Sequence, residues 1–348
     1  MKGLSIFGLA ILVILALLAV EFIVLQIGIR DFASVKRVIQ EVAILQVINQ
    51  MEFLKKAQEQ ALPYSFYKAY DFVGKRGGYF SLANVDSYNC IPYWRVYDQI
   101  NVPTQTTLLK NITEAASEAF NKYMDEFRGE GGFEIPSYTA EITSIPSPNV
   151  FRVKAESSGN LKFSISNLEL EEEDRFMDTV PSCLINETRI GKNQFITTDS
   201  IKNAIDDAIS NITEDCTNRD NELRNKINQK ITSLSTTVDD VEVSLSVKNI
   251  WVSHSEIEDS SCGYYSCTNS SGTYYCSCGS KCCWNESSVS YCHKYINYKG
   301  AANVLITVKN TSMEYLIGNE RRNIPLKFRV LDGNLIVTPP TNICSETI

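Results

Sequence analysis

Apolar residues fill almost every position from Leu4 to Ile29, and a pattern of helical spacing continues beyond them until Pro63. A helix rises ~1.5 Å per residue, so this apolar run measures ~39 Å, more than the ~30 Å hydrocarbon core of a bilayer. The pattern predicts a transmembrane anchor over residues 1–29. The competing interpretation is a signal peptide, whose apolar core is ~7–15 residues long and ends at small residues, here those of Ala16–Ala19.

Residues 30–62 carry apolar side chains at three- and four-residue steps, with Lys, Arg, Glu and Gln between them. This spacing predicts an amphipathic stalk helix that continues the apolar one. The apolar stripe consists of Phe32, Val35, Val38, Val42, Leu45, Ile48, Met51 and Leu54. Such a stripe packs either on the chain's own folded domain or on copies of the same helix, as in a coiled coil or filament core.

This N-terminal layout resembles that of type IV pilin-like proteins, including archaeal ones. It consists of Lys2-Gly3, an apolar run that starts at once at Leu4, and a long amphipathic helix leading into a head. In that family a dedicated peptidase cuts after such a Lys-Gly pair, and the apolar helices bundle into the filament core. The resemblance therefore implies processing between Gly3 and Leu4. The family commonly carries Glu at the fifth mature position, where this chain has Gly8.

Glu21 is the ionisable residue inside the apolar run. Carboxylates are costly in hydrocarbon and therefore count as functional candidates, although a tilted helix would also bring Glu21 near the membrane interface. Gln26 lies roughly on the same helix face, and both side chains suit a contact between helices. We therefore expect lateral helix association through Glu21 and Gln26, together with Val42 and Leu45 of the stripe.

The remaining chain reads as two successive units, 63–197 and 198–348, each with helices followed by strands. Apolar spacing predicts helices over 106–127 and from about residue 199 to 231, and alternation predicts several strands after each. Short similarities between the two units suggest a duplication, in which residues 256–298 are an insertion into the second copy. The expected fold class is α+β: an N-terminal transmembrane helix, a long amphipathic helix, and an ectodomain of helices and antiparallel sheet with a disulfide-rich insertion.

Cysteine usage bears on the compartment, because a high density of cysteines is typical of oxidising surroundings. Seven of the eleven cysteines lie within the insertion, where their spacing fits zinc ligation poorly and favours disulfides. Both numbers are odd, so one thiol is left over or bonds to another chain. The disulfide candidates are Cys90, Cys183, Cys216, Cys262, Cys267, Cys276, Cys278, Cys282, Cys283, Cys292 and Cys344.

Two features of the sequence disagree about the side of the membrane on which the chain lies. Basic residues just after the apolar run favour a cytoplasmic location, whereas the cysteines favour an extracytoplasmic one. We expect the latter, with nearly the whole chain outside the cell. Six Asn-x-Ser/Thr sequons are compatible with it as candidate glycosylation sites: Asn111, Asn186, Asn211, Asn269, Asn285 and Asn310.

The sequence offers few residues that could carry out catalysis or bind a cofactor. The two histidines, His254 and His293, lie in no recognisable nucleophile, metalloprotease or dinucleotide motif, so we expect no enzyme, cofactor or metal. A net charge of −8 offers no basic excess for nucleic acid. The expected function is structural or adhesive: a single-pass surface protein that contacts the lipid bilayer, copies of itself in a filament, or a surface ligand at its cysteine-rich loop. The alternatives are a ligand-binding receptor ectodomain and an extracellular enzyme.

Overall fold

The computed structural model describes most of the chain backbone outside the cysteine-rich insertion. The described residues are 6–128, 133–147, 149–165, 168–172, 175–196, 198–212, 219–258, 265–269, 272–276, 283–284, 294–317, 320–342, 344 and 348. Side chains are described within these ranges except mainly at 6–16, 19, 27–36, 165–172, 256–296 and 315–320. The structure is α+β, with helices and a mixed β-sheet.

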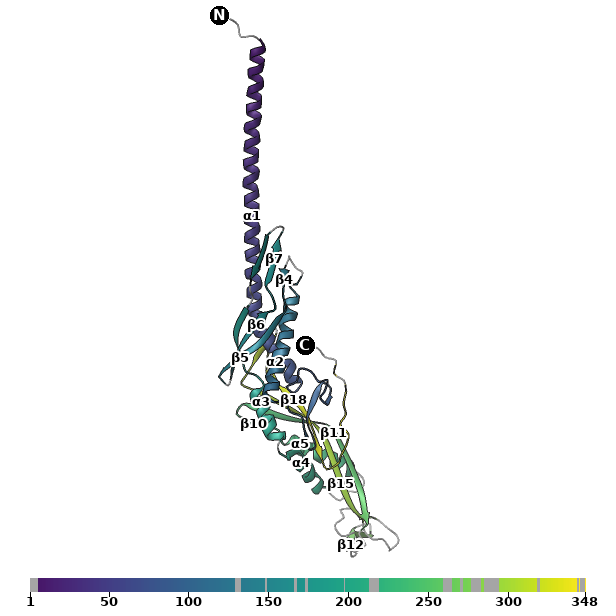
Figure 1. The fold of residues 1–348 in the computed structure, drawn as a ribbon. Helices are drawn as coiled ribbons and strands as arrows, with labels where there is room; N and C mark the ends of the chain where they lie inside the picture. The colour runs from purple at the N-terminus through teal and green to yellow at the C-terminus, as the bar shows by residue number, and fades with distance from the viewer. Residues whose placement is uncertain are drawn as a thin grey trace. The chain divides into compact units, whose positions relative to one another are not determined.

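One uninterrupted helix, α1 (Ile6–Lys75), forms the N-terminal part of the described chain, drawn in purple in Figure 1. The transmembrane anchor expected over residues 1–29 is wrong. Among the described residues, no helix has the length and apolarity needed to cross a membrane.

The amphipathic helix also continues beyond residue 62, because α1 runs through Pro63. A proline inside a helix removes one backbone hydrogen bond, here the one to the carbonyl of Glu59. Glu59 is exposed, so water can satisfy that carbonyl. The helix ends instead at two glycines: Gly78 N–H donates to Val73 O and Gly77 N–H to Gly74 O, which is a Schellman cap. Gly77 has the positive φ of 56° that this cap requires.

The chain divides into two compact units that are interleaved in sequence. The first contains residues 1–60, 124–137 and 157–175, and the second contains 61–123, 138–156 and 176–348. In the first unit, a sheet is formed by β4 (Phe133–Glu134), β7 (Leu161–Ile165) and β8 (Leu168–Glu172). Its aromatic pair Phe133 and Phe163 has ring centroids 4.3 Å apart.

A seven-stranded sheet forms the centre of the second unit, in the order β1-β2-β18-β15-β11-β10, with β3 also paired to β2. It is mixed rather than antiparallel as expected, because β2 and β18 pair in parallel although they lie far apart in the sequence. The strands are β1 (Ser87–Tyr88), β2 (Ile91–Val96), β3 (Gln99–Ile100), β10 (Thr236–Val238), β11 (Val241–Glu258), β15 (Lys294–Asn310) and β18 (Leu326–Gly333).

Helices of the second unit contact this sheet. The helix α3 (Ile185–Gly191) is followed directly by a π-helix (Lys192–Ile196), and α3 contacts β15. Next come α4 (Ser200–Ser210), which contacts β15 and β18, and α5 (Arg219–Thr232), which contacts β11. Their buried side chains include Ile201, Ile205, Leu223, Ile227 and Ile231, which recur at four-residue steps within each helix.

A second, three-stranded sheet consists of β5 (Tyr138–Ser147), β6 (Val150–Ser157) and β9 (Arg175–Pro181). Helix α2 (Gln105–Asp125) is fastened to β5 by side chains, since Asn121 donates to Tyr138 O and Ser117 to Ala140 O. The other described strands are short: β12 (Tyr265–Asn269), β13 (Gly272–Cys276), β14 (Cys283–Trp284), β16 (Tyr315–Ile317) and β17 (Glu320–Arg322).

Several aromatic residues between Tyr64 and Tyr97, the segment that follows the predicted stalk, belong to the core. Trp94 is fully buried and stacks on Phe328 with ring centroids 3.8 Å apart. Its indole N–H donates to Gly77 O at 2.9 Å, so the end of α1 is fastened to the central sheet within the second unit. Tyr70 and Tyr93 are also fully buried. These aromatics therefore serve packing rather than an exposed recognition platform.

Candidate functional site

The N-terminal part of α1 exposes an unusual amount of apolar surface. Large apolar side chains there are 41–64% exposed, at Leu17, Leu18, Val20, Phe22, Ile23, Val24, Leu25, Val38, Ile39, Val42, Ile44, Leu45, Ile48 and Phe53. Four consecutive members, residues 22–25, cover every side of a helix that turns 100° per residue. An apolar helix of this kind is stable in water only when neighbours surround it.

Farther along α1, the apolar surface divides into two faces. Met51 and Leu54 are buried, so this part of the predicted stripe does pack on the chain itself. Val42 and Leu45 remain 48% and 59% exposed. At 100° per residue they point to the opposite side of the helix from Met51 and Leu54. We call the exposed face of Val38, Val42 and Leu45 the α1 stripe.

Polar groups interrupt the apolar surface at the positions that the sequence singles out. Glu21 and Gln26 are both exposed on α1 and are therefore available to a neighbouring helix. The expected processing residues Gly3 and Leu4 lie outside the described residues. The structure thus brings Glu21, Gln26, Val42 and Leu45 together only in the sense that all four are exposed on one helix.

Two of the candidate cysteines, Cys90 and Cys344, form a disulfide across a sequence separation of 254 residues. Cys183 is a buried thiol whose Sγ lies 3.8 Å from Pro181 O. The side chains of the remaining candidates lie outside the described residues: Cys216, Cys262, Cys267, Cys276, Cys278, Cys282, Cys283 and Cys292. Within the insertion, the backbones of β13 and β14 place Cys276 opposite Cys283.

The sequon asparagines differ in exposure. Asn111 is buried, and its amide nitrogen, the atom to which a glycan is attached, donates a hydrogen bond to Gly78 O at 2.7 Å. Asn186 and Asn310 are half-buried, whereas Asn211 is exposed at the end of α4. The side chains of Asn269 and Asn285 lie outside the described residues.

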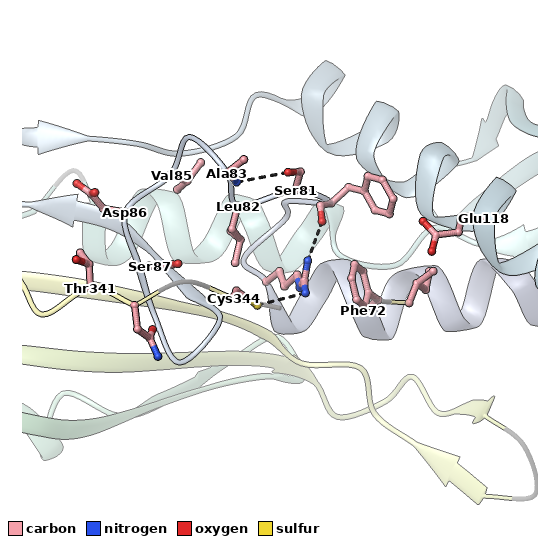
Figure 2. Close-up of a pocket in the computed structure, with 14 residues that line it drawn as sticks. Phe72, Ser81, Leu82, Ala83, Val85, Asp86, Ser87, Glu118, Thr341 and Cys344 are labelled. Atoms are coloured by element: carbon pink, nitrogen blue, oxygen red, sulfur yellow. Dashed lines mark hydrogen bonds between the residues drawn. The ribbon is translucent and has the colours of Figure 1, made fainter. Parts of the chain in front are cut away.

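A cavity of about 660 Å³ lies beside the disulfide in the second unit. Figure 2 shows residues from the end of α1, from the loop before β1, from α2 and from the C-terminal segment around it. Its walls mix apolar side chains, such as Phe72, Leu82 and Val85, with the charged side chains of Arg76, Asp86 and Glu118. This volume falls in the range of small-molecule sites, ~300–1,000 Å³.

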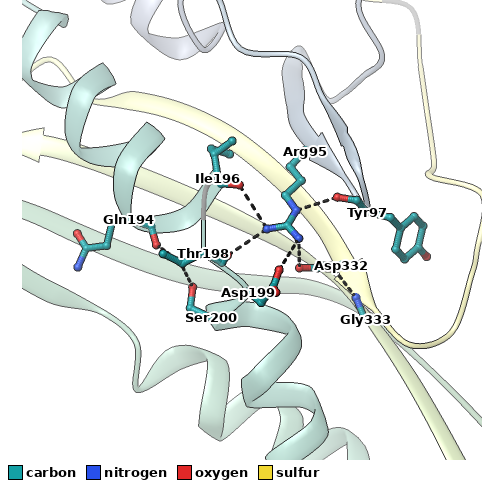
Figure 3. Close-up of polar contacts among 9 residues, drawn as sticks. All are labelled: Arg95, Tyr97, Gln194, Ile196, Thr198, Asp199, Ser200, Asp332 and Gly333. Atoms are coloured by element: carbon teal, nitrogen blue, oxygen red, sulfur yellow. Dashed lines mark hydrogen bonds and ion pairs between the residues drawn. The ribbon is translucent and has the colours of Figure 1, made fainter.

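Apart from the cavity, a cluster of polar groups surrounds Arg95 of β2 (Figure 3). Its guanidinium donates to the carbonyls of Tyr97, Ile196 and Thr198. It also pairs with Asp199 at 3.0 Å and with the buried Asp332 at 3.4 Å. Burial raises the pKa of Asp332, while the charge of Arg95 opposes that shift. Because the guanidinium is satisfied from several sides, we interpret this cluster as a structural joint between β2, β18 and the start of α4.

The part of the chain that the structure describes contains no candidate metal centre. No group of three or more His, Cys, Asp or Glu residues there is placed to hold a metal ion. His254 lies 3.4 Å from Asp220 on exposed surface, and His293 lies outside the described residues. Comparisons with protein families, with curated proteins and with solved structures find no match to this chain.

Sequence reasoning missed the residues around the cavity. The sequence predicts a stalk helix that ends at residue 62, before Arg76, and it assigns no partner to Cys344 among the eleven cysteines. The one available signal is the Lys75-Arg76-Gly77-Gly78 run, in which paired glycines mark a helix end. It predicts the turn but not the partners of the arginine.

Proposed function

We propose that this protein is a structural subunit that assembles with copies of itself through the N-terminal part of α1. The observation that carries the proposal is the exposed apolar surface of α1 at the described side chains between Leu17 and Leu25 and between Val38 and Phe53. Water penalises such surface by ~25 cal/mol per Å², so a helix that presents it on all sides favours association.

The occupant that we propose for this surface is the same helix of neighbouring copies. A single flat partner would cover one face, whereas residues 22–25 require cover all round, as a bundle of identical helices provides. The α1 stripe adds the three- and four-residue spacing of helix packing, since Val38, Val42 and Leu45 recur as in a coiled coil. The resemblance of residues 2–62 to pilin-like proteins supports the same assembly.

The proposed location is extracytoplasmic. The disulfide between Cys90 and Cys344 supports it, because such bonds persist chiefly in oxidising compartments. A role of the cysteine-rich loop in binding a surface ligand stays a prediction, as the side chains of that loop lie outside the described residues.

The experiment replaces Val42 and Leu45 by Asp in the full chain and measures assembly by sedimentation and electron microscopy. Charges introduced into a packed apolar interface are costly to bury, so we expect the double variant to lose its large assemblies. Its head should stay folded, because both side chains are exposed in the isolated chain.

The matched control places Asp at two exposed polar positions of the same helix, Gln40 and Gln50. This control adds the same charge without touching the α1 stripe, and it should assemble like the unmodified protein. Assemblies that form unchanged with Asp at positions 42 and 45 would show that the stripe is not the contact.

A further inference from the structure

The two sulfurs of the disulfide between Cys90 and Cys344 lie in different electrostatic surroundings. Nη2 of Arg76 donates to Sγ of Cys344 at 3.3 Å. Among the described cations, none makes a comparable hydrogen bond to Sγ of Cys90. The dashed line at Cys344 in Figure 2 marks this hydrogen bond.

The guanidinium is held in place rather than merely passing near the sulfur. Arg76 is 6% exposed, and its Nη1 donates to Phe80 O at 3.0 Å. The guanidinium carbon lies 4.1 Å from the centre of the Phe72 ring, within the range of a cation–π contact. The Schellman cap at Gly77 and Gly78 fixes the backbone that follows. A fixed positive charge therefore lies at one end of the S–S bond.

A neighbouring arginine stabilises a thiolate, lowering the pKa of a cysteine from ~8.5 by one to several units. In thiol–disulfide exchange, the sulfur that leaves as the more stable thiolate leaves faster. The contact with Arg76 makes Cys344 the better leaving group, so an attacking thiolate is directed to Sγ of Cys90.

The two sulfurs also differ in what surrounds them. Cys344 and Arg76 line the cavity of about 660 Å³, which gives the departing thiolate open space beside the guanidinium, whereas Cys90 is not among the lining residues. Cys90 is half-buried rather than fully buried. The attacking sulfur approaches in line with the S–S bond, so attack on Cys90 comes from the side opposite Cys344 and its cavity.

Breaking this bond would release one covalent tie of the C-terminal strap, which we define as residues 334–342 with Cys344. The strap is otherwise held by hydrogen bonds: Tyr97 Oη donates to Leu335 O and Tyr93 Oη to Pro340 O. Asn342 adds a bond from the Asn89 backbone N–H to its side-chain oxygen. The folded chain thus keeps its strap in place while the disulfide exchanges.

We propose that the Cys90–Cys344 disulfide is an exchange site for small thiols, in which the incoming thiolate attacks Cys90 and Cys344 leaves as a thiolate paired with Arg76. A new S–S bond forms between the attacking sulfur and Cys90. The old bond breaks, and its electron pair stays on Cys344. One disulfide and one thiolate are consumed and one of each is formed, so the step needs no further oxidant or reductant. This site is independent of assembly through α1.

The test incubates the full folded protein with reduced glutathione without oxygen, alkylates the released thiols, and maps the peptides by mass spectrometry. The expected result is glutathione on Cys90 and the alkylating group on Cys344. Glutathione on Cys344, equal amounts on both, or no adduct at either cysteine would overturn the proposal.

Substitution of Arg76 tests the role assigned to its charge. Because a more stable leaving thiolate leaves faster, Arg76→Met should slow exchange by roughly tenfold. Arg76→Lys should keep much of the rate. The matched control is Lys75→Met, which removes the adjacent, exposed cation that pairs with Asp71 and should exchange at the unmodified rate.

An unchanged rate in Arg76→Met would refute the role of the charge, as would equal slowing by Lys75→Met. Circular dichroism checks that each variant is folded. Should Arg76→Met fail to fold, the position of the adduct in the unmodified protein and the rate of Arg76→Lys decide the question.

Discussion

Replacing Arg95 by Met tests the polar joint between β2, β18 and α4. The guanidinium neutralises Asp332, whose side chain is 4% exposed, and satisfies three backbone carbonyls. Removing one partner of a buried ion pair typically costs ~3–5 kcal/mol because the other charge stays buried and unpaired. Asp199 adds little to this loss, since its side chain is 62% exposed. We expect Arg95→Met to lower the free energy of unfolding by ~3–5 kcal/mol.

The loss should depend on pH in a defined direction. Burial already raises the pKa of Asp332, and removing the charge of Arg95 raises it further. A carboxyl whose pKa is higher in the folded state than in the unfolded state destabilises the fold as pH rises between the two values. The penalty of Arg95→Met is therefore smallest below the ordinary pKa of Asp, ~3.9, and complete above the raised pKa of the folded state.

Urea unfolding followed by tryptophan fluorescence, at acidic and at neutral pH, measures both effects. Adding Asp332→Asn to Arg95→Met removes the unpaired charge and should recover part of the stability at neutral pH. Asp199→Asn is the control for the exposed partner, with an expected loss below ~1 kcal/mol. A loss below ~1 kcal/mol in Arg95→Met, or an equal loss at both pH values without recovery by Asp332→Asn, would refute this reasoning.

Three further predictions concern packing and titration. Gly77→Ala should lower the free energy of unfolding in urea by ~1–3 kcal/mol, because the added Cβ would meet backbone and ring atoms within 3.0 Å at a positive φ. The control is Gly159→Ala, whose Cβ meets no atom within 4 Å and which should change stability by less than ~0.5 kcal/mol. Leu54→Ala should lose ~2–5 kcal/mol in the same assay, whereas Phe53→Ala, exposed on the same helix, should leave stability nearly unchanged. Burial raises the pKa of Tyr93 to about 12, so the ultraviolet absorbance of its phenol should change near that pH in the folded protein. The free energy of unfolding should fall as pH rises from the ordinary tyrosine pKa, ~10, towards the raised pKa of the folded state. Titration of Tyr93 near ~10 in the folded protein would contradict its burial.

Sequence periodicity predicts those elements whose apolar residues pack within a single helix or strand. The apolar spacing predicts a helix over 106–127, and α2 spans Gln105–Asp125. The alternation of Leu161, Phe163 and Ile165 predicts the strand that becomes β7. The local pattern and the packed structure agree here, because α2 buries one face of apolar residues and Leu161 and Phe163 of β7 are both buried.

The remaining features depend on tertiary contacts that periodicity does not encode. Pro63 is tolerated inside α1 because only one hydrogen bond is lost, and the helix is further held by buried residues on both sides of it. The parallel pairing of β2 with β18 and the bond between Cys90 and Cys344 join segments hundreds of residues apart in the sequence. The stripe pattern is the same whether Val42 packs inside the chain or outside it, so only the structure separates its exposed face from the buried Leu54.

Site-specific photo-cross-linking is the most direct test of assembly through α1. A photoreactive amino acid replaces Val42 in the full chain, and a matched variant carries it at Gln40, about 160° around the helix. We expect irradiation at position 42 to yield covalent dimers and higher multimers of this chain, with cross-links mapped to α1 of the partner, and a much lower yield at position 40. Monomers alone, or adducts only with lipid or with other proteins, would contradict self-assembly through this helix.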